Sequence, residues 1–295
     1  MATLTIFTPS YNRAAFLQKS YEALRKQSCK DFVWMIVDDG STDNTSEEVK
    51  LIQDKESDFE IIYIYKENGG LHTGYNVAIE NANTELCMCI DSDDLIADDA
   101  VEKIISIWNK KKKDNCAGIV GLDADTTGKP ICYIKTDEEY INLNDFDITH
   151  KWAGDRKLVI RTDLYKSVAP MPVFEGEKNF NPQYMHIKIA ENYLFYVMNE
   201  VICIVDYQDT GMSAGIFKQF VNSPNSFAEY RKLQMTMKQN NWISIIKNAI
   251  FYDSSCFLAN KSKAIISESP RKIITLLVSP LGYLFSLYVK KKAKN

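Results

Sequence analysis

Short apolar runs alternate with amphipathic stretches along the first hundred residues of the chain. The apolar runs are nearly continuous, which is typical of strands that are buried on both faces of a parallel sheet. They span residues 4–9, 32–39, 61–65 and 86–91. Between them, apolar residues recur at helical spacing in residues 14–27, 41–55 and 76–82. This alternation predicts an α/β fold in which a mostly parallel sheet is flanked by helices.

Three of these predicted strands end in polar clusters. The clusters read TPSYN after the first strand, VDDGSTDN after the second and DSDD after the fourth. In sheets of this type, ligands bind at the carboxyl ends of the parallel strands. The sequence therefore predicts a binding site that is built from residues 8–12, 37–44 and 91–94.

The regular alternation weakens after residue 115. Residues 117–135 carry a turn rich in glycine and aspartate between apolar segments, which predicts a hairpin. A helix is expected over residues 183–197, before an apolar strand at 200–207. We expect one large domain over residues 1–215 and a helical C-terminal region over residues 216–295.

The C-terminal segment is strongly apolar. Residues 273–289 read IITLLVSPLGYLFSLYV, 17 residues without a charge, and basic residues stand on both sides of them. A membrane-spanning helix needs about 20 apolar residues, so the run is at the short limit, and Pro280 interrupts it. Attraction of the flanking cations to anionic lipid favours a segment that lies in the membrane interface. The alternative is a helical hairpin that packs on the protein's own core.

The composition is that of an ordinary globular protein, with 45% hydrophobic residues, 25% charged residues and a net charge of −4. Without a basic excess, a general nucleic-acid binder is disfavoured. The first residues carry no basic segment followed by an apolar stretch, so we expect no secretory signal. The seven cysteines are scattered and show no metal-ligand spacing, which favours a reduced, cytoplasmic chain over a disulfide framework or a zinc site.

Asp91, Asp93 and Asp94 follow a buried strand, where so much negative charge needs either water or a cation. Carboxylate oxygens are preferred ligands of hard cations, which often keep substrate phosphates among their other ligands. The cluster therefore predicts a site for Mn²⁺ or Mg²⁺. Asp98 and Asp99 are interpreted as caps of the helix that starts near residue 99.

The cluster VDDGSTDNT at residues 37–45 has two interpretations. In the first, Asp38 or Asp39 accepts a hydrogen bond from a nucleobase or a ribose hydroxyl, while Gly40 permits a tight turn. In the second, the cluster is only a strand–turn–helix cap without a ligand. Dinucleotide-binding and P-loop signatures are absent, because no GxGxxG follows the first strand and ENGGLHTGYN at residues 67–76 lacks GK[ST].

Four motifs occur in one order: TPSYNR, VDDGSTDNT, ENGG followed by GYNVAI, and a strand that ends in DSDD. In this order the chain resembles glycosyltransferase family 2, whose members have the GT-A (Rossmann-like) fold. Downstream, WAGD, FEGEK and VDYQDTGMS, together with the apolar tail, are similar to members that build bacterial surface polysaccharides. The resemblance implies a nucleotide-binding half over residues 1–100 and an acceptor half over 101–215.

The resemblance implies roles for particular residues in binding a nucleotide-sugar. That site would comprise Pro9, Tyr11, Arg13, Asp38, Asp39, Asn68, Gly69, Asp91 and Ser92. Pro9, Tyr11 and Arg13 would line the nucleotide pocket. Asp39 would reach the base, typically uracil, and Asp91 would face the ribose. The metal ligand would be Asp93, which would coordinate Mn²⁺ or Mg²⁺ and so help to neutralise the departing diphosphate.

An inverting transfer also needs a carboxylate that takes the proton of the acceptor hydroxyl. In the acceptor half the first candidate is Glu177 of the GEK motif, with Asp155 and Glu175 behind it. Two departures from the family pattern affect these assignments. Many relatives have a lysine after ENGG where this chain has Leu71, so no phosphate contact is assigned there. Gln183 stands where some relatives have a glutamate, and a glutamine cannot act as a base.

These observations lead to the hypothesis of an inverting, metal-dependent glycosyltransferase. It would move one sugar from a nucleotide-sugar, expected to be a UDP-sugar, to a lipid-linked or oligosaccharide acceptor. The transfer would take place at the inner face of the cytoplasmic membrane, in cell-surface polysaccharide synthesis. The Q-x-x-R-W motif of processive synthases is missing, which favours the transfer of one sugar per encounter. One alternative is a non-catalytic nucleotide- or glycan-binding relative. A sugar nucleotidyltransferase is the other, disfavoured because TPSYNR is not the glycine-rich basic loop of such enzymes.

Overall fold

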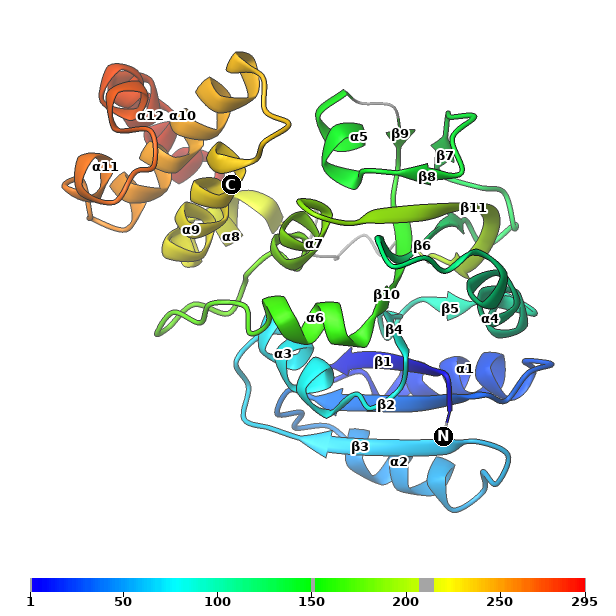
Figure 1. Cartoon of the computed structure of the whole chain (residues 1–295). Coiled ribbons are helices and arrows are strands. Elements are labelled where there is room, and N and C mark those ends of the chain that lie inside the picture. Colours follow the sequence, from blue (N-terminus) through cyan, green and yellow to red (C-terminus); the bar gives the residue numbers. More distant parts are fainter. Residues whose placement is uncertain (1, 150–151, 207–214, 295) are drawn as a thin grey trace. The chain divides into compact units, whose positions relative to one another are not determined.

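A computed structural model describes residues 2–149, 152–206 and 215–294 of the chain (Figure 1). Contacts between residues divide the chain into two compact units. Unit 1 comprises residues 1–170 and 188–206, and unit 2 comprises residues 171–187 and 207–295. The domain limits expected from the sequence, 1–215 and 216–295, stay a prediction.

A large sheet forms the centre of unit 1. Its strands are β1 (Leu4–Ser10), β2 (Phe32–Asp38), β3 (Glu60–Tyr65), β4 (Leu86–Cys89), β5 (Leu95–Ile96), β6 (Cys116–Ala124), β8 (Tyr140–Ile141), β10 (Arg156–Arg161) and β11 (Leu194–Ile204). The order is β3-β2-β1-β4-β10-β6-β11-β5, and β8 also pairs with β11. The first four strands pair in parallel, as do β6 and β11, whereas β10 runs antiparallel between β4 and β6. The prediction of a mostly parallel sheet is confirmed.

Two short strands and several helices complete unit 1. Strands β7 (Tyr133–Ile134) and β9 (Trp152–Ala153) pair with each other in antiparallel fashion. The hairpin predicted over 117–135 is present next to its turn, where Ala124 and Pro130 form an antiparallel bridge, but β7 pairs with β9 and not with β6. The helices are α1 (Ala14–Arg25), α2 (Thr45–Gln53), α3 (Leu71–Asn81), α4 (Ala100–Lys111), α5 (Leu143–Thr149) and α6 (Thr162–Val168), while α7 (Gln183–Ala190) runs across the boundary to unit 2.

Three local predictions from the sequence differ from the structure. The helix predicted over 183–197 ends at Ala190, because residues 194–197 pair with β6 and β8 as the start of β11. The helix predicted over 76–82 begins at Leu71. Asp99 occupies the N-cap position of α4, but its φ is 58° and its side chain makes no capping hydrogen bond, so the predicted side-chain cap is wrong there.

The core of unit 1 explains why these runs form strands. β1 and β2 are buried along their whole length, as expected for parallel strands covered on both faces. Trp34 has no exposed surface, and its indole N–H donates to the Thr8 hydroxyl at 3.1 Å, so its polar group is satisfied inside the core.

Unit 2 is mainly helical over its described residues after 215. Its helices are α8 (Ile216–Asn222), α9 (Pro224–Thr236), α10 (Trp242–Leu258), α11 (Ala264–Ser267) and α12 (Lys272–Lys292). α10 packs against both α9 and α12. At Gly282 of α12 the two helices come so close that an added Cβ would lie 2.4 Å from the Cβ of Asp253. The predicted helical C-terminal region is confirmed.

Candidate nucleotide-sugar site

The parallel strands β1, β2 and β4 are neighbours, so their carboxyl ends lie at one edge of the sheet (Figure 1). Ser10 pairs with Asp38 at the ends of β1 and β2, and Phe7 pairs with Cys89 at the end of β4. The loops that carry residues 10–13, 39–44 and 90–94 therefore leave the sheet from the same edge. Since β10 is antiparallel, its first residues, Arg156 and Lys157, lie at this edge too.

Asn12 joins two of these loops, a role that the local sequence does not indicate. Its Oδ1 accepts hydrogen bonds from the backbone N–H groups of Thr42 at 2.8 Å and Asp43 at 3.3 Å. Its own N–H donates to the Ser41 hydroxyl at 2.9 Å, and its φ is 52°, a conformation that asparagine tolerates better than most residues. The neighbouring Tyr11 is left 48% exposed, with its ring available to a ligand.

Asp38 forms a buried turn at the end of β2. Its Oδ1 accepts from the Ser41 N–H at 2.8 Å, and its Oδ2 accepts from the Tyr63 hydroxyl at 2.6 Å. Burial, together with this bond to Asp38, raises the pKa of Tyr63, so the phenol stays protonated as the donor. Both oxygens of Asp38 therefore have partners within the protein.

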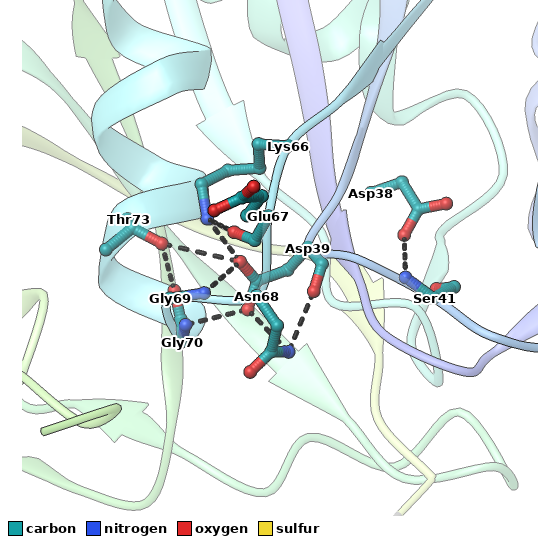
Figure 2. A network of polar contacts seen from close by, with 9 residues as sticks. All are labelled: Asp38, Asp39, Ser41, Lys66, Glu67, Asn68, Gly69, Gly70 and Thr73. Atoms are coloured by element: carbon teal, nitrogen blue, oxygen red, sulfur yellow. Dashed lines mark hydrogen bonds and ion pairs between the residues drawn. The ribbon is translucent and has the colours of Figure 1, made fainter. Parts of the chain in front are cut away.

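Asp39 organises the glycine-rich loop that leads into α3 (Figure 2). Its carboxylate accepts from the backbone N–H groups of Gly69 at 2.9 Å and Gly70 at 2.7 Å, and it forms an ion pair with Lys66. The Asn68 amide donates to the Asp39 carbonyl at 2.7 Å and to its carboxylate at 3.2 Å. The carboxylate to which the resemblance gives a contact with the nucleobase thus holds Asn68 and Gly69, two other residues of the predicted site.

Gly40 is required where these two segments meet. Its φ is 79°, and an added Cβ would lie 2.7 Å from the backbone nitrogen of Asn68. A side chain at this position would both strain the backbone and push the glycine-rich loop away. The close contact of the VDDG turn with the ENGG loop therefore depends on glycine at residue 40.

The acidic loop, residues 91–94, is a tight turn between β4 and β5. The N–H of Asp94 donates to the carbonyl of Asp91 at 3.0 Å. The Asp93 carboxylate is partly exposed and lies 3.9 Å from the Arg13 guanidinium, an ion pair without a close hydrogen bond. Ser92 is buried, and its carbonyl accepts from Ser20 at 3.4 Å. Of the predicted residues in this loop, Asp93 thus lies beside the predicted residue Arg13.

A buried group of charges lies behind the acidic loop, and nothing in the local sequence around its members indicates it. The ammonium of Lys157 donates to the Asp94 carboxylate at 2.7 Å, and both side chains are almost fully buried. Asp123, near the end of β6, is 1% exposed, and burial raises its pKa to about 7. Asp155, predicted as a reserve base, is exposed just before β10 and contributes to the raised pKa of Asp123.

The residues of the loop fit a metal that takes part of its coordination from a ligand. Among the residues that the structure describes, no group of three or more His, Cys, Asp or Glu side chains could hold a metal ion by itself. Mg²⁺ is usually bound by one or two carboxylates together with water and substrate phosphates, so a complete protein cage is not required. Asp93, whose carboxylate is accessible, and Asp91 two residues before it meet that description.

Glu177 belongs to unit 2, where it caps α9. Its Oε1 accepts from the N–H and the side-chain amide of Asn225 at 2.8 and 2.6 Å. Its Oε2 accepts from the N–H and the hydroxyl of Ser226 at 2.7 and 2.6 Å. Anions are favoured at a helix N-terminus, and these four bonds use both oxygens of the carboxylate. Gln183, six residues on, accepts from the Tyr230 hydroxyl at 2.6 Å.

Similarity to known proteins agrees with this arrangement. Residues 5–162 match the family model described as glycosyl transferase family 2. An uncharacterised glycosyltransferase of Rickettsia typhi is 23% identical over 300 residues, which cover 97% of this chain and 92% of the relative. Glycosyltransferase GlyA of Streptococcus pneumoniae is 35% identical over 101 residues, which cover 34% of this chain and only 14% of GlyA.

Two solved structures share the fold. TarS of S. aureus in complex with UDP-GlcNAc has a TM-score of 0.63 and 16% identity, covering 92% of this chain and 78% of that chain. Mannosyltransferase PcManGT from Pyrobaculum calidifontis, in complex with GDP-Man and Mn²⁺, has a TM-score of 0.57 and 15% identity, covering 99% and 83%. Because the family model spans more than half of the chain, this protein belongs to glycosyl transferase family 2 and is a glycosyltransferase with the GT-A fold.

Proposed function

We propose that this glycosyltransferase is metal-dependent and inverting, and that it moves one sugar from a nucleotide-sugar to a lipid-linked glycan in cell-surface polysaccharide synthesis. The observation that carries the proposal is the position of Asp93. Its accessible carboxylate and the Arg13 guanidinium are neighbours at the sheet edge, where the loops after β1, β2 and β4 leave the sheet. This is a suitable place for the diphosphate of a nucleotide-sugar, because a cation site and an arginine both attract phosphate.

A UDP-sugar is the proposed donor. TarS has been solved with UDP-GlcNAc and with UDP, whereas PcManGT has been solved with GDP-Man, so a GDP-sugar is the alternative to test. The exposed ring of Tyr11 and the buried Pro9 would form one wall of the nucleotide pocket. Asp39 would act at the base side, either by contacting the base directly or by holding the loop at Asn68 and Gly69 against it.

Asp91 and Asp93 of the acidic loop would act at different parts of the donor. Asp91 would accept from a ribose hydroxyl, with Ser92 beside it, and Asp93 would hold Mn²⁺ or Mg²⁺. When bound, such an ion supplies charge that stabilises the departing diphosphate. Arg13 would leave its loose ion pair with Asp93 and donate to a phosphate oxygen, since guanidinium–phosphate bonds are stronger than an exposed pair at 3.9 Å.

The base that takes the acceptor's proton is proposed to be Glu177 or Asp155. For Glu177 this requires the N-terminus of α9 to release one carboxylate oxygen, because four hydrogen bonds occupy the carboxylate. Asp155 is exposed just before β10, where an acceptor hydroxyl could approach it from solvent. Transfer rates of Glu177→Gln and Asp155→Asn separate the two: the base variant loses transfer while nucleotide affinity is kept.

Thermal unfolding in the presence of nucleotides tests the donor and the metal together. The chain would be heated with UDP, GDP, CDP or dTDP, each with and without Mn²⁺, and selective native-state binding would raise its Tm. We expect a Mn²⁺-dependent rise with UDP in the wild type and in Asp54→Ala, an exposed control directly after α2. Asp93→Ala should abolish the Mn²⁺-dependent part. An unchanged metal dependence in Asp93→Ala would move the metal site elsewhere.

A non-catalytic nucleotide- or glycan-binding relative is the second candidate. The observation that favours it is that Glu177 is engaged as a helix cap while Gln183 carries no carboxylate. This candidate predicts nucleotide binding without turnover. Release of UDP from UDP-sugars over long incubation, with an unrelated active glycosyltransferase as positive control, separates it from the enzyme.

Helix α12 is proposed to lie in the membrane interface. In the described part of the chain it is the one helix that is long and apolar enough to cross a membrane. One face packs on α10, where Gly282 meets Asp253, while Ile273 is 76% and Leu277 74% exposed on the surface. On α10, Trp242 and Ile243 are 70% and 80% exposed. Such apolar surface, flanked by the lysines at 290–292, suits an anionic membrane surface.

Sedimentation with lipid vesicles tests this placement. The chain should sediment with vesicles that contain anionic lipid and much less with neutral ones. Leu277→Ser combined with Leu284→Ser should reduce binding, because both leucines are largely exposed, at 74% and 60%. Leu51→Ser, an exposed leucine on α2, is the matched control. Equal binding by the double variant and the control would contradict interfacial contact through α12.

A further inference from the structure

Lys157 is a buried cation at the edge of the sheet that carries the proposed donor site. It is the second residue of β10, whose antiparallel course between β4 and β6 places its first residues beside the carboxyl ends of those strands. The side chain of Lys157 is only 13% exposed. Lysine is almost never buried unless it is paired, so the partners of Lys157 indicate why it is there.

The partners of Lys157 are acidic. Its ammonium donates to Asp94 at 2.7 Å, and the Asp94 side chain is 7% exposed. Burial by itself would lower the pKa of Lys157, but Cys203, Asp91, Asp94 and Asp123 around it raise that pKa well above its ordinary value. Lys157 therefore stays charged beside Asp94.

The pair also fixes the end of the acidic loop. Leu95 follows Asp94 directly and pairs with Ile204 of β11, while at the other end the N–H of Ile90 donates to Phe7 of β1 at 3.0 Å. Between these anchors, three of the four residues 91–94 are aspartates, and their mutual repulsion would open the turn without a nearby cation. Lys157 provides that cation from behind the loop.

The position of Lys157 also separates the three aspartates. Asp94 is buried and engaged with Lys157, whereas Asp93 is partly exposed beside Arg13. A carboxylate that is held by an internal ammonium is unavailable to an incoming cation. This leaves Asp91 and Asp93 for the donor and its metal, and it directs Asp94 to a structural role.

We propose that Lys157 is a positioning residue: by pairing with Asp94 it holds the acidic loop in the shape that binds the metal and the nucleotide diphosphate, without touching either. The inference rests on the proposed metal-dependent donor binding, and it predicts that the effect of Lys157 passes entirely through Asp94.

A double-mutant cycle tests this. Lys157→Met leaves Asp94 buried and unpaired next to Asp93, and loss of an outer group that orients a metal site typically costs about 10- to 100-fold in affinity. We expect UDP affinity in Mn²⁺, measured by calorimetry, to fall at least about tenfold, with little change in UDP affinity without Mn²⁺. Asp94→Leu/Lys157→Met removes both charges, which is often neutral for stability, and should restore affinity to within about threefold. Lys112→Met, at a largely exposed pair with Glu85, is the matched control.

Hydrogen exchange of the ligand-free chain provides an independent measurement. Amides of residues 90–97 should exchange faster in Lys157→Met and return towards wild type in the double variant. If Lys157→Met does not fold, the double variant decides by its affinity. Wild-type behaviour of Lys157→Met in both measurements would overturn the inference, and so would a folded double variant that fails to bind UDP, since Lys157 would then contact the ligand itself. If the wild type binds no nucleotide, the proposed function fails, and exchange alone still decides whether Lys157 holds the loop.

Discussion

Asp253 offers a sharp test of the packing in unit 2. Its side chain is fully buried on α10 against Gly282 of α12, and neither carboxylate oxygen has a hydrogen-bond partner among the residues that the structure describes. Burial raises the pKa of this carboxyl from 3.8 to about 8. The pair of helices therefore accommodates the neutral acid, and Asp253→Asn, which cannot ionise, is the informative change.

The sign of the effect follows from proton binding. Because the pKa is higher in the folded chain, the folded state keeps a proton that the unfolded state has already lost. The stability contribution is fully present below the unfolded value near 4 and is lost as the pH rises through the folded value near 8. The difference between a pKa of 3.8 and one of about 8 corresponds to roughly 6 kcal/mol of folding free energy, of which roughly 4 kcal/mol is lost between about pH 5 and pH 8.

Hydrogen exchange measured on peptides of α10 and α12 gives the local free energy of opening. Wild type and Asp253→Asn would be compared at the same pH, so that the intrinsic pH dependence of exchange cancels. We expect near equality at about pH 5 and slower exchange in the variant at about pH 8, by up to about a thousandfold. Asp54→Asn, at the exposed residue that follows α2, should not alter these peptides.

If the ratio of exchange rates between Asp253→Asn and the wild type does not change with pH, this reasoning is refuted. Such a constant ratio would mean that Asp253 has the same proton affinity in the folded and unfolded chains, as it would if water or a cation reached the carboxylate. Slower exchange in the wild type at high pH would reverse the sign and exclude burial as the cause.

Three further predictions follow from contacts at glycine and carboxylate positions. Gly282→Ala should lower the free energy of local unfolding of α10 and α12, measured by hydrogen exchange, by about 1–3 kcal/mol, because the added Cβ meets Asp253. This loss exceeds the gain of about 1 kcal/mol in helix propensity. Gly215→Ala, whose added Cβ meets nothing within 4 Å, should not lower it. Glu177→Gln should lower the free energy of local opening at the start of α9, measured by hydrogen exchange, by roughly 1–3 kcal/mol, because an amide donor then faces N–H groups in place of an acceptor. The affinity for UDP should stay unchanged. Asp39→Asn should lower UDP affinity at least about tenfold in calorimetry by releasing the glycine-rich loop; unchanged affinity would show that the loop is held by other contacts.

Much of the fold could be predicted from the sequence because its signals are local. Continuous apolar runs such as 32–39 form buried parallel strands, and the polar residues that follow them lie at one edge once the strands pair. That edge collects Tyr11, Arg13, Asp38 and Asp93 by topology alone. The helix predicted over 183–197 shows the limit of this reasoning, because the apolar residues at 194–197 are equally suited to a strand, and pairing with β6 decides between them.

The partners of individual carboxylates could not be predicted in the same way. Asp38 and Asp39 are adjacent in the sequence, yet Asp38 bonds Tyr63 of β3 while Asp39 bonds the loop before α3. Glu177 is held by residues 48 and 49 positions later in the chain. Nothing in the local pattern around any of these acids distinguishes a helix cap or a loop anchor from a ligand.

By itself, the sequence determined the alternation of strands and helices, the order of the four motifs and the edge at which they meet, because these depend on local periodicity and on the direction of parallel strands. Only the tertiary structure decided which charges face one another. Lys157 reaches Asp94 from 63 residues away because β10 runs antiparallel beside β4. Side-chain partners depend on the register of distant strands. The free-energy cost of burying a charge is offset only when that register brings the opposite charge next to it.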